Sequence, residues 1–475
     1  MKFLKRTEVR LFFTIFLVYL FFLSDYGGNW MADSIIDSAM AFVDTGEFIV
    51  DNYIKGPQDN AFFKGHHYSG FAPGASFLVM PLYLIFKPLM NIFLPTLLFN
   101  YPQIQIKVIL MNIIATIFLT IPSSALLSVL LYRFLGYFTE NKKDKIWISL
   151  FFSFGTLIFV YSTGYYRRPI AILLCFLAFY LLYKMKHQHL LITPQLLFLI
   201  GFILGFAVFI EYTMFILVGF MCLYLLTFMR TKKLLWFIIG IIIPLILLLT
   251  YHYYIFEDPF TTPYMHRASP RAQSITSLSD VFNNLPTSET IFGVTFSFER
   301  GIFIYSPIIL FSFIGIFLFF KSRQKKHFTE MVIITLIVFS YIIFNASQLD
   351  IWLAGCSFGP RFLMPALPFL MIPLVYSFRE INKIIIISMG LISIFINLLS
   401  AVYGITGLWR GICTSSNPLK EYLLLIPERG LTNYTINLIN ERLATLSILK
   451  INLLALTWVL VLFFVIRKIW KSPSI

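Results

Sequence analysis

Charged residues are scarce in this chain. Of its 475 residues, 12% are charged and 59% are hydrophobic, whereas a soluble domain usually carries about 25% charged residues. Apolar runs recur from one end to the other, and a helix needs roughly 20 such residues to cross a hydrocarbon core about 30 Å thick. Strands of a membrane barrel would alternate apolar and polar residues instead. The composition therefore excludes a soluble globular domain and predicts an all-α polytopic membrane protein with about twelve transmembrane helices.

Cysteine is also rare, and the four cysteines form no regular framework. Cys175 and Cys222 lie inside apolar runs and are interpreted as packing residues. Cys356 and Cys413 fall in loops placed outside the membrane, and the sequence leaves open whether they pair. The chain lacks a glycine-rich phosphate loop, a Cys/His zinc spacing and a dinucleotide fingerprint. No cofactor is therefore expected, and a divalent metal on outer carboxylates is an alternative that nothing selects.

The excess of basic residues, a formal net charge of +15, indicates orientation rather than nucleic-acid binding. Lys and Arg concentrate in the short connections between apolar runs, and Asp and Glu in the long ones. Because cytoplasmic loops are rich in Lys and Arg, both termini are predicted to be cytoplasmic in a plasma or inner membrane. The N-terminus has no small-residue cleavage site and is interpreted as an uncleaved first span. The predicted spans are 9–25, 106–132, 146–164, 169–184, 195–210, 212–229, 234–252, 302–320, 328–346, 364–378, 384–404 and 448–466.

The long polar segments then share the outer side of a single integral membrane domain, 1–475. They are a first outer loop with interfacial helices (25–105), a segment that is a candidate lid (253–301), residues 347–363, and a loop before the last span (405–447). Segment 75–99 is apolar but interrupted by prolines, so we expect it to lie at the interface; a kinked further span is the alternative. Polar loops of this length commonly carry function.

Two carboxylates just past the first span are candidate catalytic groups. Asp33 and Asp25 would lie where a membrane-bound general base meets a lipid headgroup and a polar acceptor. The structural alternative is that Asp33 or Ser34 only caps the helix that runs to Thr45.

A second set of charged residues suggests phosphate binding. Arg167 and Arg168 open the fourth span, and a guanidinium group bonds two phosphate oxygens at once; snorkelling to the interface is the alternative. Glu211 lies at the outer end of a short helix pair, where a carboxylate needs a partner or a water-filled cavity. An arginine on a neighbouring helix would also satisfy it. The other predicted substrate-binding residues are Lys64, His66, His67, Tyr68, Ser69, His266, Arg267, Arg300 and Arg361.

Five segments carry a family resemblance. They are Tyr-Ser-Gly-Phe-Ala-Pro-Gly at 68–74, Gly-Phe-Ala-Val-Phe-Ile-Glu-Tyr at 205–212, Asp-Pro-Phe at 258–260, and the segments 298–307 and 352–365. In this order the chain resembles the GT-C superfamily of membrane glycosyltransferases, which take sugars from polyprenyl-phosphate donors. The likeness is to bacterial and archaeal relatives of dolichyl-phosphate-mannose protein mannosyltransferases and lipid A aminoarabinose transferases.

The resemblance implies an acidic catalytic residue near the end of the first span, followed by interfacial helices and the 68–74 element. The chain departs from it at two points. Relatives often carry Asp-Lys where this chain has Gly70-Phe71, and that lysine is expected to meet the lipid phosphate; Lys64, His66 or His67 would have to replace it. Asp33 matches the acidic position only with a shift of two residues.

These features predict a glycosyltransferase that moves a hexosyl or pentosyl group from a polyprenyl-phosphate donor to a glycan, lipid or protein acceptor at the outer face of the membrane. One base and in-line attack predict inversion at the anomeric carbon. The rival readings are a lipid-linked sugar transporter or flippase, an O-antigen ligase or polymerase that uses lipid diphosphates, and a relative that binds lipid-linked sugars without catalysis. A transporter would show repeated halves and mid-membrane charges, and neither is evident.

Overall fold

The chain folds into two compact units that are each built from separate parts of the sequence. The computed structural model describes residues 6–24, 30–54, 59–93, 103–267, 285–348, 355, 357–403, 415–430, 433 and 448–471. Unit 1 comprises Met1–Ser24, Ile121–Gly164 and Pro286–Ile475, and unit 2 comprises Asp25–Thr120 and Tyr165–Leu285. The expectation of a single membrane domain is not tested by this division.

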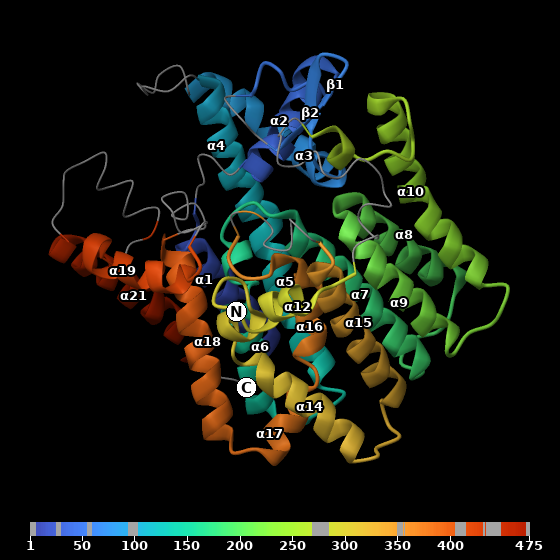
Figure 1. The fold of residues 1–475 in the computed structure, drawn as a ribbon, viewed down its shortest axis with the longest axis vertical. Helices are drawn as coiled ribbons and strands as arrows, with labels where there is room; N and C mark the ends of the chain where they lie inside the picture. Colours follow the sequence, from blue (N-terminus) through green and yellow to red (C-terminus); the bar gives the residue numbers. More distant parts are fainter. Residues whose placement is uncertain are drawn as a thin grey trace. The chain divides into compact units, whose positions relative to one another are not determined.

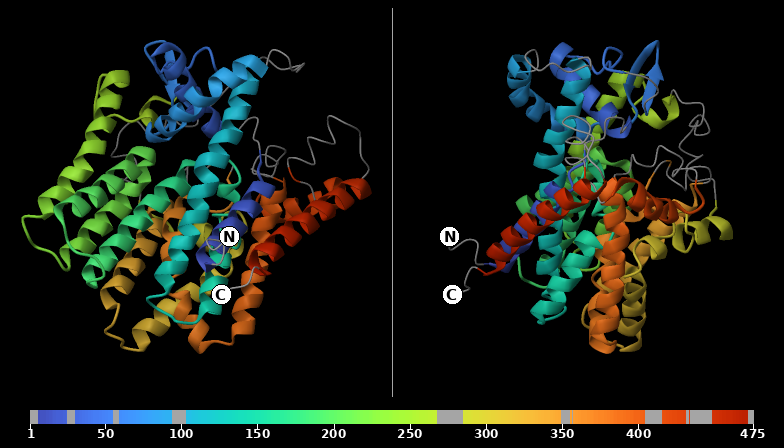
Figure 2. Two further views of the ribbon diagram at one scale, coloured as in Figure 1. Left: turned by 180° about the vertical axis from the view of Figure 1, so that it is seen from behind. Right: turned by 90° about the vertical axis from the view of Figure 1, so that its left-hand side faces the viewer.

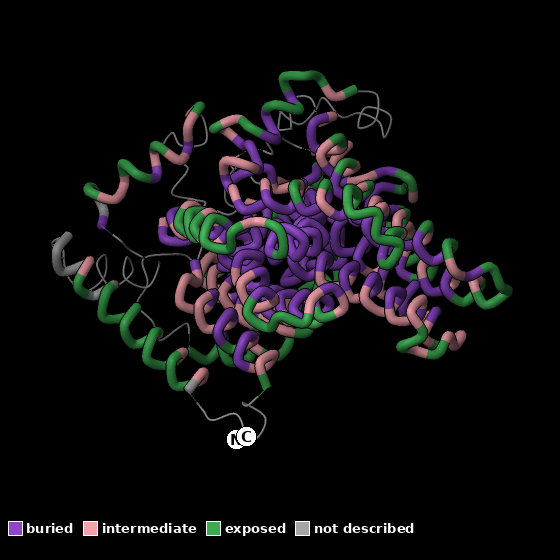
Figure 3. The backbone as a smooth tube through the Cα atoms, turned by 90° about the horizontal axis from the view of Figure 1, so that it is seen from below, coloured by how far each residue is buried: buried purple, intermediate pink, exposed green. Residues whose placement is uncertain are grey.

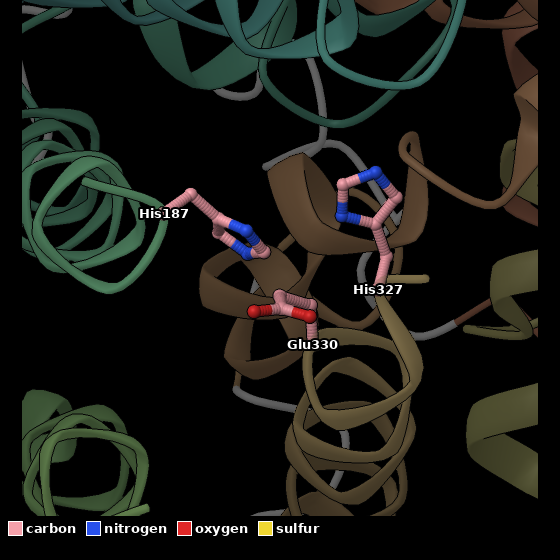
Figure 4. A group of neighbouring side chains, drawn as sticks. All are labelled: His187, His327 and Glu330. Atoms are coloured by element: carbon pink, nitrogen blue, oxygen red, sulfur yellow. The ribbon is translucent and has the colours of Figure 1, made fainter. Parts of the chain in front are cut away.

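All regular elements in the described part of unit 1 are helices (Figure 1). Its helices are α1 (Thr7–Phe21), α5 (Ile121–Leu135), α6 (Lys142–Phe154), η4 (Val160–Ser162), α12 (Ser288–Thr295), α13 (Ile302–Tyr305), α14 (Ile309–Lys321), α15 (Phe328–Ala346), η9 (Arg361–Ala366), α16 (Leu367–Leu370), α17 (Leu374–Glu380), α18 (Lys383–Tyr403), α19 (Pro418–Arg429) and α21 (Ile448–Lys471). Figure 4 shows the side chains of His327 and Glu330, which lie before and within the first turn of α15.

Unit 2 combines helices with one small hairpin. Its elements are α2 (Trp30–Thr45), β1 (Asn60–Phe63), β2 (His66–Ser69), α3 (Gly74–Phe93), α4 (Gln103–Ala115), η3 (Thr116–Thr120), α7 (Arg167–Lys186), α8 (Pro194–Ile210), η5 (Tyr212–Met214), α9 (Phe215–Leu226), α10 (Leu234–Phe256) and η6 (Pro263–His266). The two strands pair antiparallel, with Asn60 opposite Ser69 and Phe63 opposite His66. Helices α7, α8, α9 and α10 lie side by side (Figures 1 and 2).

Membrane-spanning character is evident in several helices. Among the described residues, six helices are long and apolar enough to cross a bilayer, and a bent pair, Arg361–Leu370 with Leu374–Glu380, would make a seventh. The all-α polytopic prediction is therefore confirmed in kind, while the count of about twelve is not. The predicted spans at 195–210, 212–229 and 302–320 correspond to apolar helices of fewer than 18 residues. Many helices have one packed and one exposed face, as Figure 3 shows.

Two predicted segments differ in shape from the expectation. The span predicted at 146–164 is α-helical only to Phe154, with Gly155 as the C-cap, and the short 3-10 helix η4 follows at Val160–Ser162. The apolar segment predicted to lie at the interface contains one continuous helix, α3, with Pro81 and Pro88 inside it. Its length and composition would allow it to cross a bilayer. Within unit 2, however, Lys87 of α3 forms an ion pair with Asp44 of α2 at 2.7 Å.

The exposed residues of helix α10 indicate which of its ends lie at the membrane interfaces. Its exposed residues between the two ends are apolar, among them Ile242, Ile246 and Leu247, while Trp236 is exposed near one end and Tyr253 and Tyr254 near the other. Aromatic residues of this kind gather at the two membrane interfaces. A rise of 1.5 Å per residue puts Trp236 and Tyr253 about 26 Å apart, close to the thickness of a hydrocarbon core. The C-terminal end of α10 therefore lies at one interface.

Candidate functional site

The loop that joins β2 to α3 carries the 68–74 element and is fixed by hydrogen bonds to α2. The Oγ atoms of Ser34 and Ser69 lie 3.2 Å apart, and the amide of Gly70 donates to Ser34 Oγ at 3.3 Å. Ser76 Oγ donates to the carbonyl of Ile35 at 2.9 Å. Ser69, one of the predicted substrate-binding residues, is buried in this network.

Glycine is required at two positions of this loop. A Cβ on Gly70 would lie 2.0 Å from the carbonyl oxygen of Asp59, and a Cβ on Gly74 would lie 2.6 Å from the carbonyl oxygen of Phe209. Only glycine permits so close an approach of two backbones. Gly74 thus brings the start of α3 against the end of α8, where Glu211 follows directly.

Two buried arginines share one buried carboxylate. Arg167 and Arg168 begin α7, and Glu211 is the C-cap residue of α8. Glu211 Oε2 lies 2.9 Å from Arg167 Nε and 3.4 Å from Arg168 Nε, and the side chains are 1 to 6% exposed. An unpaired ion is costly in such surroundings. The pairing of Glu211 with arginine, one of the two readings of the sequence, is what the structure shows.

A third arginine joins this cluster through aromatic rings. Arg167 lies over the ring of Phe71 at 4.5 Å, and Arg267 lies 5.8 Å from the same ring and 4.6 Å from the ring of Tyr264. Arg167 Nη2 donates to Tyr264 Oη at 3.4 Å. Within the described part of the chain, neither the buried Nη1 of Arg167 nor the buried Nε of Arg267 has a hydrogen-bond acceptor. We call Arg167, Arg168, Arg267, Glu211 and Tyr264 the arginine cluster.

The arginine cluster lies at the depth of a membrane interface. Tyr212, next to Glu211, has its Oη atom 2.8 Å from Nε2 of His252 on α10, and the rings of Tyr212 and Tyr264 are 5.9 Å apart. His252 directly precedes Tyr253 and Tyr254, which are exposed and mark the interface. Guanidinium groups at this level would lie beside lipid headgroups rather than acyl chains.

Two carboxylates of α2 lie near the same loop. Asp33 is in the first turn of α2, so it does not cap the helix, and its Oδ1 accepts a hydrogen bond of 2.9 Å from Asn112 Nδ2. Asp37 follows one turn later and is 1% exposed. Residues four apart share a helix face, and Ser34, beside Asp33, contacts the loop that leads to Phe71. The two acids and the arginine cluster therefore belong to one connected region of unit 2.

Comparison with known proteins gives a solved structure that is similar to the chain. No family profile matches the chain, and no curated protein matches it. The chain is similar to ArnT. The match is to the crystal structure of ArnT from Cupriavidus metallidurans bound to undecaprenyl phosphate, with 12% identity and a TM-score of 0.48. It covers 94% of this chain and 73% of ArnT.

An identity this low assigns neither an activity nor a substrate to the chain.

The three basic residues of the hairpin, Lys64, His66 and His67, contact carboxylates at the surface. Lys64 Nζ lies 2.5 Å from Glu257, and Asp51 accepts from Nδ1 of both His66 and His67, at 2.8 and 2.9 Å. Burial acts to raise the pKa of Asp51, but the bonds from the two histidines outweigh it, and the pKa lies below its usual value. These contacts attach the hairpin to its surroundings, and the predicted part of Lys64, His66 and His67 in substrate binding stays a prediction.

Tyr68 and His266 pack against the end of α10. The ring of His266 stacks on Phe256 at 4.6 Å, and the ring of Tyr68 meets Phe256 edge-on at 6.1 Å. Burial lowers the pKa of His266, with the charge of Asp258 acting in the opposite direction, so the imidazole is neutral at neutral pH. His266 is adjacent to Arg267 in sequence and helps to hold the end of this segment in place.

Arg300 and Arg361 belong to unit 1. Arg300 is 1% exposed, and its guanidinium donates to the carbonyls of Glu299 and Gly355 at 2.7 and 3.1 Å. Arg361 lies 5.8 Å from the ring of Phe362. Their predicted part in substrate binding stays a prediction, and Asp25, Cys356 and Cys413 lie outside the described residues.

Sequence reasoning missed several residues of this region. Asp37 was detectable, because it lies four residues after Asp33 on a predicted helix. Tyr264, Asn112 and His252 carry no local signal, since each contacts the region from an element distant in sequence. The only sequence feature that marks Asn112 and His252 is that each is a polar residue inside an apolar helix, and such residues are commonly functional.

Proposed function

We propose that this chain is a glycosyltransferase that moves a sugar from a polyprenyl-phosphate donor to a hydroxyl acceptor at the outer face of the membrane. One observation carries the proposal: two buried guanidinium donors, Nη1 of Arg167 and Nε of Arg267, lie at interface depth and have no acceptor within the described chain. A buried cationic donor needs an anion. At that depth the anion of matching chemistry is a lipid phosphate.

The arginine cluster suits the leaving group of such a reaction. As the acceptor oxygen attacks the anomeric carbon, the bond from that carbon to the phosphate oxygen breaks and polyprenyl phosphate departs with increased charge. Fixed donors aimed at the developing charge stabilise the transition state. The counterion Glu211 holds the guanidinium groups of Arg167 and Arg168 in place, so that they need not reorganise during the reaction.

An acidic residue of α2 would take the proton of the acceptor hydroxyl. Asp33 is the candidate base of the sequence pattern, and its bond from Asn112 fixes its orientation. Asp37 lies one turn further on the same helix. A single base opposite the leaving group predicts inversion of configuration at the anomeric carbon.

Proteoliposomes that contain the full chain test the proposal. The donor is undecaprenyl phosphate carrying a radiolabelled sugar, the acceptor is a polar extract of cell envelope, and the readout is both labelled product and released undecaprenyl phosphate. Arg267→Gln should raise the Kd for undecaprenyl phosphate roughly 10- to 100-fold, because a charge-assisted hydrogen bond contributes about 1.5–3 kcal/mol. Asp33→Asn should lower kcat by about 10² or more with little change in Kd.

The matched control is Lys107→Gln, which removes a cation of unit 2 whose Nζ bonds Asn91 at the surface. It should change neither quantity. Undiminished transfer in Asp33→Asn and in Asp37→Asn would refute a carboxylate base on α2. Transport of the intact donor without release of undecaprenyl phosphate would favour a flippase.

A further inference from the structure

A row of aromatic rings runs along α8 and ends at the arginine cluster. Phe198, Phe202 and Phe206 recur every four residues and are half-buried. Their ring centroids are 6.3 and 6.1 Å apart, and the rings of Phe202 and Phe206 are parallel within 6°. The row continues to Phe209, 5.8 Å from Phe206. We call these four residues the phenylalanine ladder.

Ring contacts continue from the phenylalanine ladder to helices α3 and α10 of unit 2. Phe209 contacts Phe77 of α3 at 5.3 Å, and Phe77 stacks with Phe48 at 6.0 Å. Phe48 in turn meets Tyr251 of α10 edge-on at 5.0 Å. The last ring of the ladder therefore lies at the interface, and Glu211 of the arginine cluster follows it by two residues.

The length of the ladder matches one leaflet. From Phe198 to Phe209 the helix rises about 16 Å at 1.5 Å per residue. Half of a hydrocarbon core about 30 Å thick is about 15 Å. A lipid whose phosphate rests on Arg167 and Arg267 would have its chain beside these rings for the depth of the leaflet.

We infer that the phenylalanine ladder is the binding track for the hydrocarbon chain of the donor and selects long polyprenyl chains. This inference rests on the proposed function. One backbone bond in every four of an isoprenoid chain is a double bond that does not rotate, so the chain has fewer rotatable bonds than a saturated acyl chain of equal length and loses less conformational entropy on binding. Rings fixed by stacking present a rigid apolar surface. Both features favour a polyprenyl chain over the surrounding lipid.

The neighbouring helix keeps the ladder in place. Gly201 and Gly205 of α8 face α10, where a Cβ on either would lie 2.1 or 2.5 Å from a backbone carbonyl oxygen of that helix. Two backbones this close hold α8 at a fixed rotation. The face that carries Phe198, Phe202 and Phe206 is therefore presented in one orientation and does not depend on lipid.

The test compares two probes, undecaprenyl phosphate and geranyl phosphate, which share the phosphate and differ in chain length. The full chain is placed in phosphatidylcholine nanodiscs, and Kd is measured for wild type and for the double variant Phe202→Leu/Phe206→Leu. Leucine keeps the helix apolar and removes only the rings. The matched control is Phe313→Leu/Phe317→Leu on α14, which removes two rings at the same spacing from another apolar helix.

We expect the wild type to bind undecaprenyl phosphate at least tenfold more tightly than geranyl phosphate. The ladder variant should lose about tenfold in affinity for the long chain and none for the short one, while the control retains both affinities. Unchanged preference for the long chain in the ladder variant would overturn the inference and leave the proposed function standing. Failure of the wild type to bind either phosphate would overturn both.

Discussion

Glu211 is the residue on which the charge balance of the cluster depends. Its carboxylate is 1% exposed and faces the guanidinium groups of Arg167 and Arg168. A buried ion pair contributes little net stability compared with apolar residues of the same size, but removing one partner leaves an uncompensated charge. The ion pairs of Glu211 with Arg167 and Arg168 therefore indicate a role in binding rather than a role in stabilising the fold.

Substitution of Glu211 tests this asymmetry. Glu211→Ala should lower the free energy of unfolding by about 3–5 kcal/mol, because two buried guanidinium groups lose their counterion. Combining it with Arg168→Leu should recover part of the loss, as a thermal unfolding assay in detergent would show. A double variant that is as destabilised as the sum of the two single changes would mean that the groups are not coupled.

Asp51 gives a pH dependence at the residue scale. Its pKa in the folded state lies below the unfolded value of about 3.9. The stability it contributes is thus fully present above that value and is lost as pH falls through the folded pKa. Amide hydrogen exchange of the hairpin, corrected for intrinsic rates, should show weaker protection at about pH 2.5 than at about pH 5. In Asp51→Asn the acid-dependent change should disappear; if it persists, another group controls the hairpin.

At the scale of elements, glycine allows α8 and α10 to approach closely. A Cβ on Gly240 would lie 2.2 Å from the carbonyl oxygen of Phe198, whereas a Cβ on Gly219 of α9 would meet no atom within 4 Å. Small residues at helix interfaces have this role in membranes, where packing rather than water drives association. The orientation of the phenylalanine ladder follows from this contact.

Alanine substitutions separate close packing from helix propensity. Gly240→Ala should lower the thermal unfolding midpoint, since overpacking of this kind costs about 1–3 kcal/mol. Gly219→Ala should leave the midpoint unchanged or raise it, because alanine is favoured over glycine in helices by up to about 1 kcal/mol. Equal effects of the two substitutions would show that α8 and α10 do not pack as described.

The element boundaries show where sequence reasoning succeeds and fails. The spans predicted at 328–346 and 384–404 agree closely with α15 and α18, because each is a long apolar run that follows a basic turn. The span predicted at 364–378 is broken into η9, α16 and α17, with a bend of 53°. Pro365, Pro368 and Pro373 signal a break, but composition alone cannot fix its angle, which depends on what the broken ends pack against.

At the scale of the whole molecule, the predicted sidedness remains to be measured. The positive-inside pattern places Lys64 outside and Lys325 in the cytoplasm. With the four native cysteines replaced by serine, Lys64→Cys should react with an impermeant maleimide in intact cells, and Lys325→Cys only after permeabilisation. Both residues are exposed, so burial would not explain a failure to label. Labelling of both from one side would refute the topology and the outer-face reaction together.

The sequence by itself determined the membrane environment, the helical class and the chemical character of the site. The length and apolarity of the runs determined the membrane environment and the helical class. The acids and arginines that interrupt these runs determined the chemical character of the site, because such residues are tolerated at a bilayer only with partners or a function. Tertiary structure decided which groups meet. The pairing of Arg167 with Glu211, the place of Arg267 beside Phe71 and the bond from Asn112 to Asp33 join positions about 40 to 200 residues apart. Contacts at such separations depend on how helices pack in three dimensions, and no local pattern of residues records them.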